Sequence, residues 1–318
     1  MHKKKQPIIA LKKDDIVNDI FAVKFKKPIE PYKNGYKFEL RLADSSMEIM
    51  YKYWGPPEEV KVQMLYDLIK KDDVVLVQGR VSEWNGRLEI SANEECALTV
   101  LVPGDYDVRD FIKKTSRSVD AMWKELLSLV ASVKDSDLRR ILAYFFEDLA
   151  FAQRFRDAPG AMYIHHGWLG GLLEHTLSVA RLCDSMQTLH PTLDRDLLIT
   201  GALLHDIGKL SEFEMTTSIR MTAEGMLVGH VMIAAEMLAK AMDSLKTPGT
   251  LRMKLTHIIM THMGEYGSSK KPAFPEALAI HYADKTDGDL MHMTTLIKEA
   301  QTEDDFIYHK DFGNLYLE

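Results

Sequence analysis

The residues with the clearest capacity for chemistry are histidines and aspartates in the second half of the chain. Two of them, His205 and Asp206, are adjacent where an apolar stretch ends in "ALLHDIGKL". Others stand on neighbouring predicted helices: His175, His230, His262 and Asp284. A helical domain can aim one imidazole or carboxylate inward from each of several helices and so build a metal site. Imidazole nitrogen with carboxylate oxygen suits Mn, Fe, Co, Ni or Zn rather than calcium.

The pair at the end of the apolar stretch is the most informative feature. Burying His205 and Asp206 is costly without a partner, and a divalent cation is a natural partner for them. Asp206 could bridge two cations while His205 binds one. We expect Gly208 to relax the chain there and Lys209 to place a positive charge near a bound phosphate. A single histidine such as His257, by contrast, is more often a satisfied core residue than a ligand.

The elements that must position these residues follow from hydrophobic periodicity. From about Val119 apolar residues recur every three or four positions and strand signals nearly vanish, which predicts an all-α domain. The first hundred residues alternate instead, as in Tyr36–Asp44, and Asn85-Gly86 between "RVSEW" and "RLEIS" predicts a tight hairpin. Short strands with tight curvature favour a small OB-type barrel, and Pro56–Asp73 fits the helix that such barrels often carry.

From this change in hydrophobic periodicity we predict three parts in the 318 residues: an OB-like β-barrel domain over 1–103, a linker over 104–118 and an all-α helical bundle over 119–318. The formal net charge of −7 argues against a generally basic nucleic-acid binder. The negative charge lies in the part after residue 103, however, and the N-terminus is rich in lysine. This asymmetry permits one end to handle a polyanion while the other holds cations.

The predicted barrel offers a surface for nucleic acid. OB barrels commonly bind single strands on an aromatic and basic face. The residues that we expect to contact the substrate there are Tyr36, Arg80, Trp84 and Arg87. An exposed aromatic residue near a turn often only packs the rim of a barrel, so each of these also has a purely structural explanation.

Several classes of protein are disfavoured by what the sequence lacks. No apolar run approaches the roughly 20 residues of a membrane span, and the basic N-terminus has no apolar segment typical of a secretory signal. Cys96 and Cys183 are far apart in different predicted domains, so a disulfide framework is not expected and a reducing cytoplasm fits. The absence of a P-loop and of a convincing G-x-G-x-x-G motif argues against an ATPase or a dinucleotide enzyme.

The motifs taken together resemble a known superfamily. "LEHT", followed about thirty residues later by "LLHDIGK" and then by "GH", "THM" and "HYADK", is similar to the HD-domain metallophosphohydrolases. The longer stretches "APGAMYIHHGWLGGLLEHTLSVA" and "HMGEYGSSKKPAFPEALAIHYADKTDG", behind an OB-like domain, resemble bacterial 3′–5′ exoribonucleases of the YhaM type over nearly the whole chain. That family combines an N-terminal OB fold with a C-terminal HD domain.

The resemblance implies roles for particular residues. The first metal site would consist of His175, His205, Asp206 and Asp284. In dinuclear members a second metal, bridged by Asp206, would be bound by His230 and His262. Lys209 would contact the scissile phosphate, and His166 would line the pocket. The cofactor would be one or two divalent ions, Mn first, with Fe, Co, Ni, Zn or Mg as alternatives.

One departure from the family pattern bears on the second metal. Thr261 stands where dinuclear relatives often carry a histidine, and losing a ligand there should weaken that site. His257, roughly a turn away, could compensate, although its spacing aligns poorly. Occupancy by a single metal and weak activity therefore both stay open.

Three functional hypotheses remain. The leading one is metal-dependent hydrolysis of single-stranded RNA from the 3′ end to nucleoside 5′-monophosphates, with Asp206 and Lys209 as catalytic residues. Single-stranded DNA as a substrate and a homo-oligomeric state are left open, and no membrane partner is expected. The second hypothesis is an HD phosphohydrolase acting on mononucleotides or signalling nucleotides. The third is a non-catalytic nucleic-acid-binding protein, for which Thr261 is the best support.

Overall fold

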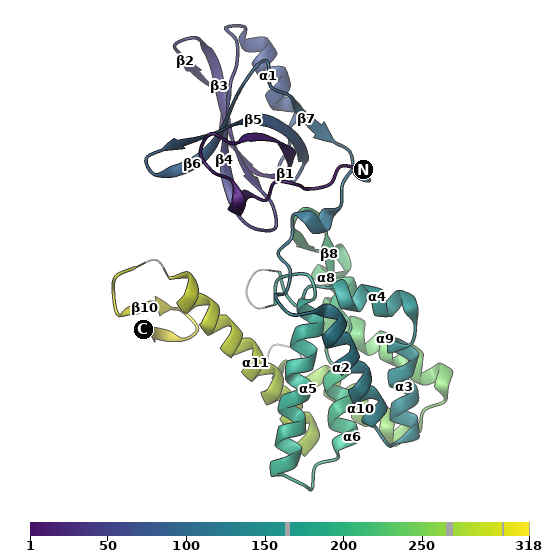
Figure 1. Cartoon of the computed structure of the whole chain (residues 1–318). Helices are drawn as coiled ribbons and strands as arrows, with labels where there is room; N and C mark the ends of the chain where they lie inside the picture. The colour runs from purple at the N-terminus through teal and green to yellow at the C-terminus, as the bar shows by residue number, and fades with distance from the viewer. Residues whose placement is uncertain (163–165, 265–269, 301, 318) are drawn as a thin grey trace. The chain divides into compact units, whose positions relative to one another are not determined.

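A computed structural model describes residues 1–162, 166–264, 270–300 and 302–317. The chain divides into two compact units (Figure 1). The first consists of Met1–Lys113 with Met215–Ile219, and the second of Lys114–Glu214 with Arg220–Glu318. The segment predicted as a linker is shared between them, because Phe111 is buried beside Ile20 in the first unit.

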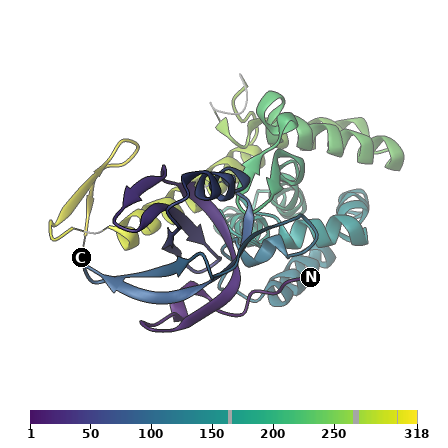
Figure 2. The ribbon, with the colours of Figure 1, turned by 90° about the horizontal axis from the view of Figure 1, so that it is seen from above.

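The first unit has the predicted OB-like fold, and its strands form one mixed sheet. It contains two 3-10 helices, Ile8–Ala10 and Val108–Asp110, and one α-helix, α1 (Glu59–Leu68), between β4 and β5. Its strands are β1 (Ile16–Lys26), β2 (Glu30–Tyr32), β3 (Gly35–Ala43), β4 (Glu48–Trp54), β5 (Val74–Trp84), β6 (Arg87–Asn93) and β7 (Leu98–Leu101). Strand β1 pairs with both β3 and β5, β6 lies between β4 and β5, and the β4–β6 pair is parallel. Figure 2 shows the strong curvature of these strands, drawn in purple and blue.

Two features of β5 explain this curvature. The strand pairs with β1 along one edge from Val74 to Arg80, and along its other edge the partner changes from β7 at Val77 to β6 at Arg80. At the change of partner a Cβ on Gly79 would lie 2.8 Å from the side chain of Ile90, so only glycine fits between the strands. The predicted hairpin is confirmed, because Asn85 and Gly86 have φ angles of 50° and 74° and join β5 directly to β6.

The second unit is the expected helical domain. Its helices are α2 (Val119–Ser132), α3 (Ser136–Phe146), α4 (Leu149–Asp157), α5 (Gly171–Leu189), α6 (Arg195–Leu204), α7 (Lys209–Glu212), α8 (Ala223–Leu227), α9 (Gly229–Leu245), α10 (Gly249–Thr261) and α11 (Pro275–Glu299). The structure adds two hairpins, whose three- and four-residue strands are too short to give a recognisable alternation: β8 (Phe213–Met215) with β9 (Ile219–Met221), and β10 (Phe306–His309) with β11 (Gly313–Tyr316). None of the helices in the described ranges has the length and apolarity to cross a membrane.

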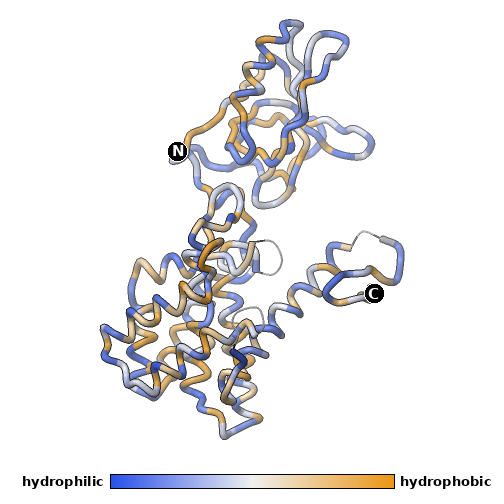
Figure 3. The backbone as a smooth tube through the Cα atoms, turned by 180° about the vertical axis from the view of Figure 1, so that it is seen from behind, coloured by the Kyte–Doolittle hydropathy of each residue, from blue (hydrophilic) through white to orange (hydrophobic). Residues whose placement is uncertain are grey.

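Helix α6 is the centre of the second unit. Every residue from Leu197 to Leu204 is buried, and the helix contacts α5, α10 and α11. A Cβ on Gly201 would lie 2.5 Å from the side chain of Ile280 in α11, so the glycine allows close helix packing. In Figure 3 apolar and polar segments alternate along the helices of this unit. The apolar residues that precede His205 in "ALLHDIGKL" therefore lie in the core of this unit.

Replacing Leu198 by alanine tests the central position of α6. The side chain is fully buried, so Leu198→Ala should lower the free energy of unfolding by about 2–5 kcal/mol. Leu189→Ala is the matched control, because Leu189 at the end of α5 is 76% exposed. Urea unfolding followed by far-UV circular dichroism measures both changes. Equal effects of the two substitutions would contradict the assignment of α6 to the core.

Candidate metal centre

The six residues proposed as metal ligands converge within the second unit. They come from five helices or the residues that directly follow them: His175 in α5, His205 and Asp206 after α6, His230 in α9, His262 after α10, and Asp284 in α11. The side chains of His175, His205, Asp206 and His262 are almost completely buried, and the other two are 14% exposed. Their ligand atoms form two clusters that share Asp206.

The first cluster has the spacing of a metal site. His175 Nε2 lies 3.1 Å from Asp284 Oδ1, 3.2 Å from His205 Nε2 and 3.4 Å from Asp206 Oδ2. His205 Nε2 lies 3.3 Å from Asp206 Oδ2 and 3.8 Å from Asp284 Oδ1. Ligands held about 2.1 Å from one ion are roughly 3–3.5 Å apart. The four side chains therefore fit a divalent metal of the kind that imidazole and carboxylate select.

The second cluster is built on the other oxygen of the same carboxylate. Asp206 Oδ1 lies 3.6 Å from His230 Nε2 and 3.5 Å from His262 Nε2. All three atoms are buried, and none has a hydrogen-bond partner among the residues that the structure describes. Leaving such atoms unpaired costs free energy, whereas a cation shared by the three would satisfy them.

The four imidazoles are oriented through their other nitrogen. Each Nδ1 donates a hydrogen bond of 2.7–2.9 Å to an oxygen that can only accept, so the lone pair of each Nε2 points into the clusters. The acceptors are the Asp287 carboxylate for His175, the Ala202 carbonyl for His205, the Glu212 carboxylate for His230 and the Ile259 carbonyl for His262. Metal-binding histidines usually have this kind of support.

The electrostatics favour bound cations. Burial opposes charge on Asp206, but Lys209 and His205 outweigh it and hold the pKa of the carboxyl well below its usual range. Burial likewise opposes ionisation of Asp284, and the hydrogen bond with His175 nevertheless lowers the pKa of that carboxyl. Burial alone would lower the pKa of His175, yet the surrounding carboxylates raise it well above its ordinary value. A metal would take the place of the proton on this imidazole.

Lys209 lies one turn beyond Asp206, with its Nζ 2.6 Å from Asp206 Oδ2. Its side chain is only 12% exposed. Burial disfavours the charge, but the neighbouring carboxylate raises the pKa of Lys209 above its ordinary value. The structure thus places a charged ammonium beside the shared ligand. Its contact with a phosphate stays a prediction.

His166 lies beside the first cluster, and its place along a substrate pocket stays a prediction. Its ring is buried, and its Nε2 is 3.0 Å from the same Asp287 oxygen that accepts from His175 Nδ1. Glu174, whose Oε2 is 4.0 Å from His166 Nδ1, accepts hydrogen bonds from Thr115 and Trp168. His166 therefore belongs to a polar network that supports His175. The motif around it extends into residues 163–165, outside the described residues.

Two carboxylates that accept hydrogen bonds from the clustered histidines were not predicted from the sequence. Asp287 is three residues after Asp284 on α11, and Glu212 is three residues after Lys209 on α7. Both spacings put the second residue near the first on a helical face, which was the available signal. Glu212 accepts hydrogen bonds from both the backbone N–H and Nδ1 of His230.

The suggestion that His257 could replace the histidine missing at Thr261 is wrong. His257 Nε2 accepts a hydrogen bond from the backbone N–H of Ala273, and its ring packs against Phe274. The Thr261 hydroxyl donates to the His257 carbonyl within α10. Neither side chain belongs to the clusters found among the described residues, so the second cluster offers two imidazoles and the shared carboxylate.

The substrate contacts expected on the OB-like unit do not lie on one surface. Arg80 lines one groove, while Trp84 and Arg87, paired across the hairpin, line another. Tyr36 lines neither, and its hydroxyl hydrogen-bonds to Glu59 of α1. Alternation along the strands identified outward-facing residues, but it did not show how the coiled strands distribute them.

Comparison with known proteins places the site in a class. The family model described as HD domain matches residues 172–289, a range that holds all six clustered residues. The second unit is an HD domain, and the chain is a hydrolase of the HD class whose His/Asp clusters could hold divalent metals.

Two relatives define the family more closely. The 3′-5′ exoribonuclease YhaM of Listeria innocua is 30% identical over 271 residues, 84% of either chain. That of Shouchella clausii is 30% identical over 264 residues, 82% of this chain and 80% of the relative. The protein belongs to the family of these YhaM exoribonucleases. The solved OB domain of Ta0387 from Thermoplasma acidophilum, 16% identical over 27% of this chain and 74% of that domain, has a TM-score of 0.22, which adds nothing to the assignment.

The role expected for Gly208 is wrong, and the correction gives a test. Its φ of −64° and ψ of −23° are ordinary helical values, so the backbone there needs none of the extra conformational freedom of glycine. A Cβ would instead lie 2.0 Å from the His230 carbonyl oxygen and 2.7 Å from the Ala234 nitrogen. The glycine is needed because the backbone of α9 passes directly over it.

Gly208→Ala should therefore displace α9 and withdraw His230 from the second cluster. We expect about 1–3 kcal/mol of destabilisation and weaker binding of a second Mn²⁺ than in the wild type. Thermal unfolding and metal titration by calorimetry measure these effects. Gly249→Ala is the control, since a Cβ there meets nothing within 4 Å. Unchanged metal binding by Gly208→Ala would contradict the proposed dependence on α9.

Asp287→Asn tests the support of His175. The substitution keeps the shape but removes the charge that accepts from His175 Nδ1 and His166 Nε2, so affinity for the first Mn²⁺ should fall by about 10–100-fold. Asp289→Asn is the control, because Asp289 forms a surface ion pair with Lys285 at 2.8 Å and belongs to neither cluster. Equal Mn²⁺ affinities of the two variants, both shown to be folded, would exclude this role for Asp287.

Proposed function

We propose that the protein is a metal-dependent 3′–5′ exoribonuclease that hydrolyses single-stranded RNA to nucleoside 5′-monophosphates. The observation that carries the proposal is the buried carboxylate of Asp206, whose two oxygens each face a separate set of ligand atoms. Such an arrangement suits one or two divalent ions next to a phosphodiester. The relatives named 3′-5′ exoribonuclease support the polymer substrate and the direction of cleavage.

The chain's own residues would contribute positioning and charge. A divalent ion held by the clustered residues would lower the pKa of a water molecule and offset charge on phosphoryl oxygens. Asp206 fixes the position of both clusters through its two oxygens. Lys209, charged and mostly buried, can shift from Asp206 to a non-bridging phosphate oxygen and stabilise the negative charge that develops there.

The OB-like unit would hold the RNA upstream of the cleaved bond. An OB fold binds single strands by stacking and backbone contacts, so the acidic helical unit need not bind RNA strongly by itself. The two free cysteines, Cys96 and Cys183, fit the reducing cytoplasm in which we expect the enzyme to act.

The test uses a 5′-labelled single-stranded RNA with Mn²⁺. The wild type should shorten the RNA progressively from its 3′ end, and His205→Ala and Asp206→Ala should abolish this ladder. Lys209→Met should lower kcat by roughly 10²–10³ because one charge-stabilising donor is lost. Circular dichroism confirms that each variant is folded.

Some results would refute this function. RNA that stays intact with folded protein across Mn, Mg, Co, Fe, Ni and Zn would exclude the exonuclease. Release of phosphate or nucleosides from mononucleotides under those conditions would favour a small-nucleotide phosphohydrolase instead.

A further inference from the structure

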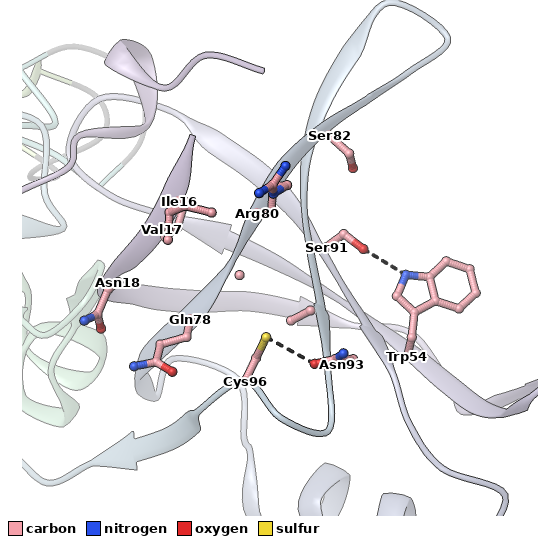
Figure 4. Close-up of a pocket in the computed structure, with 12 residues that line it drawn as sticks. Ile16, Val17, Asn18, Trp54, Gln78, Arg80, Ser82, Ser91, Asn93 and Cys96 are labelled. Carbon is pink, nitrogen blue, oxygen red and sulfur yellow. Dashed lines mark hydrogen bonds between the residues drawn. The ribbon is translucent and has the colours of Figure 1, made fainter. Parts of the chain in front are cut away.

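Two grooves on the outer surface of the OB-like unit differ in the number of charged side chains that line them. The first, of about 730 Å³, lies across β1, β4, β5 and β6 and is shown in Figure 4. Its lining has no carboxylate among the described residues, and its polar side chains are neutral apart from Arg80. We call it the amide groove, after its side chains Asn18, Gln78 and Asn93. The second groove, of about 680 Å³, contains Trp84 and Arg87.

The second groove is a poor surface for a polyanion, because three of its four basic side chains already have a carboxylate partner. Three carboxylates line it, and each lies close to a basic side chain. These pairs are Lys27–Glu39 at 2.6 Å, Lys52–Glu89 at 2.6 Å and Arg41–Glu48 at 3.7 Å. A phosphate backbone entering this groove would have to compete with the carboxylates for every one of these cations.

In the amide groove hydrogen bonds orient two amides so that their donors are available. The side-chain oxygen of Gln78 accepts from the backbone N–H of Ala97 at 3.2 Å. The side-chain oxygen of Asn93 accepts from the backbone N–H of Glu95 at 3.1 Å and from the Cys96 thiol at 3.3 Å. Since the oxygens are engaged, each NH₂ group remains to donate to a ligand.

A cation and an aromatic ring complete the amide groove. Arg80 is exposed, and its Nη1 is 3.8 Å from Asp14 Oδ1, a surface pair of small energetic value. The Trp54 indole donates to Ser91 Oγ at 3.0 Å, which fixes the ring at the edge of the groove (Figure 4). A ligand rich in acceptors, negatively charged and able to stack matches this set of groups.

We propose that the amide groove binds a segment of the single-stranded nucleic acid, with Arg80 on a phosphate and the amides of Gln78 and Asn93 on base carbonyls. The proposal rests on the function proposed above and names the surface that holds the strand. Of the residues of the OB-like unit that were expected to bind substrate, Arg80 alone lines this groove. Trp54 provides a face on which a base can stack.

Cys96 allows a direct test, because it lines the amide groove and is half-buried. The other cysteine, Cys183, is completely buried, and burial raises the pKa of its thiol to about 12. Alkylation of the folded full-length protein by N-ethylmaleimide should therefore report on Cys96 alone. A chelator keeps the RNA intact, and mass spectrometry measures the rate of modification.

Oligouridine, whose bases are rich in carbonyl oxygens, should protect Cys96. At ten times its Kd, determined by fluorescence anisotropy, it should slow alkylation about tenfold, since about nine-tenths of the protein is then occupied. DNA of matching length is the second arm. Protection by RNA alone would show that the groove recognises the 2′-hydroxyl. Protection by both RNA and DNA would show that it recognises the phosphates and bases that the two strands share.

Substitutions give an independent measurement. Arg80→Ala should weaken RNA binding by roughly tenfold or more and Gln78→Ala by roughly threefold. Their controls are Arg41→Ala, which removes the same charge outside the amide groove, and Gln63→Ala on α1, whose amide bonds to Asp67. Equal losses in Arg80→Ala and Arg41→Ala would indicate general charge attraction and overturn the proposal.

The outcomes distinguish failure of the amide groove from failure of the proposed exonuclease activity. RNA that is bound and degraded while Cys96 reacts at its free rate would overturn the amide groove and leave the exonuclease standing. RNA that protects Cys96 but is never cleaved with any of the metals would support the groove and refute the exonuclease. RNA that does not bind at all would overturn the groove.

Discussion

The structure of the helical unit depends on one buried negative charge. The carboxylate of Asp206 has almost no contact with solvent, and an isolated ion in such a place would be very unfavourable. Groups that can offset this charge therefore surround it: the Lys209 ammonium on one side and, on the others, imidazole Nε2 atoms that could share a cation with it. The helices that carry these groups must meet at this point, so their packing and the chemistry of the site are set together.

The sequence predicted much of this centre because its signals are local or periodic. Adjacent His205 and Asp206 after an apolar helix indicated a metal, and helical spacing put the other four candidates on neighbouring helices. The supporting residues Asp287 and Glu212 have ordinary surface chemistry in sequence, and only the packing of α11 and α7 reveals what they contact. Gly208 was misinterpreted for the same reason, since the α9 backbone above it is distant in sequence.

In the OB-like unit the sequence predicted a local turn but not the arrangement of the exposed side chains. Positive-φ turn chemistry located the hairpin at Asn85-Gly86 to the residue, because that signal is contained in the two residues themselves. The arrangement of outward side chains was not predictable in this way. Strand β5 changes partner near Gly79, so residues on the same face of one strand, such as Arg80 and Trp84, reach different grooves.

The support of the four imidazoles follows a rule that is repeated in both clusters. In each, one histidine ends a helix and bonds to a main-chain carbonyl three residues back, as His205 does to Ala202 and His262 to Ile259. The other depends on a carboxylate side chain. A main-chain acceptor survives any substitution that preserves the helix, whereas a carboxylate can be exchanged in one mutational step. Evolution or an engineer could thus change the affinity of either cluster for a cation separately, while every candidate ligand stays in place.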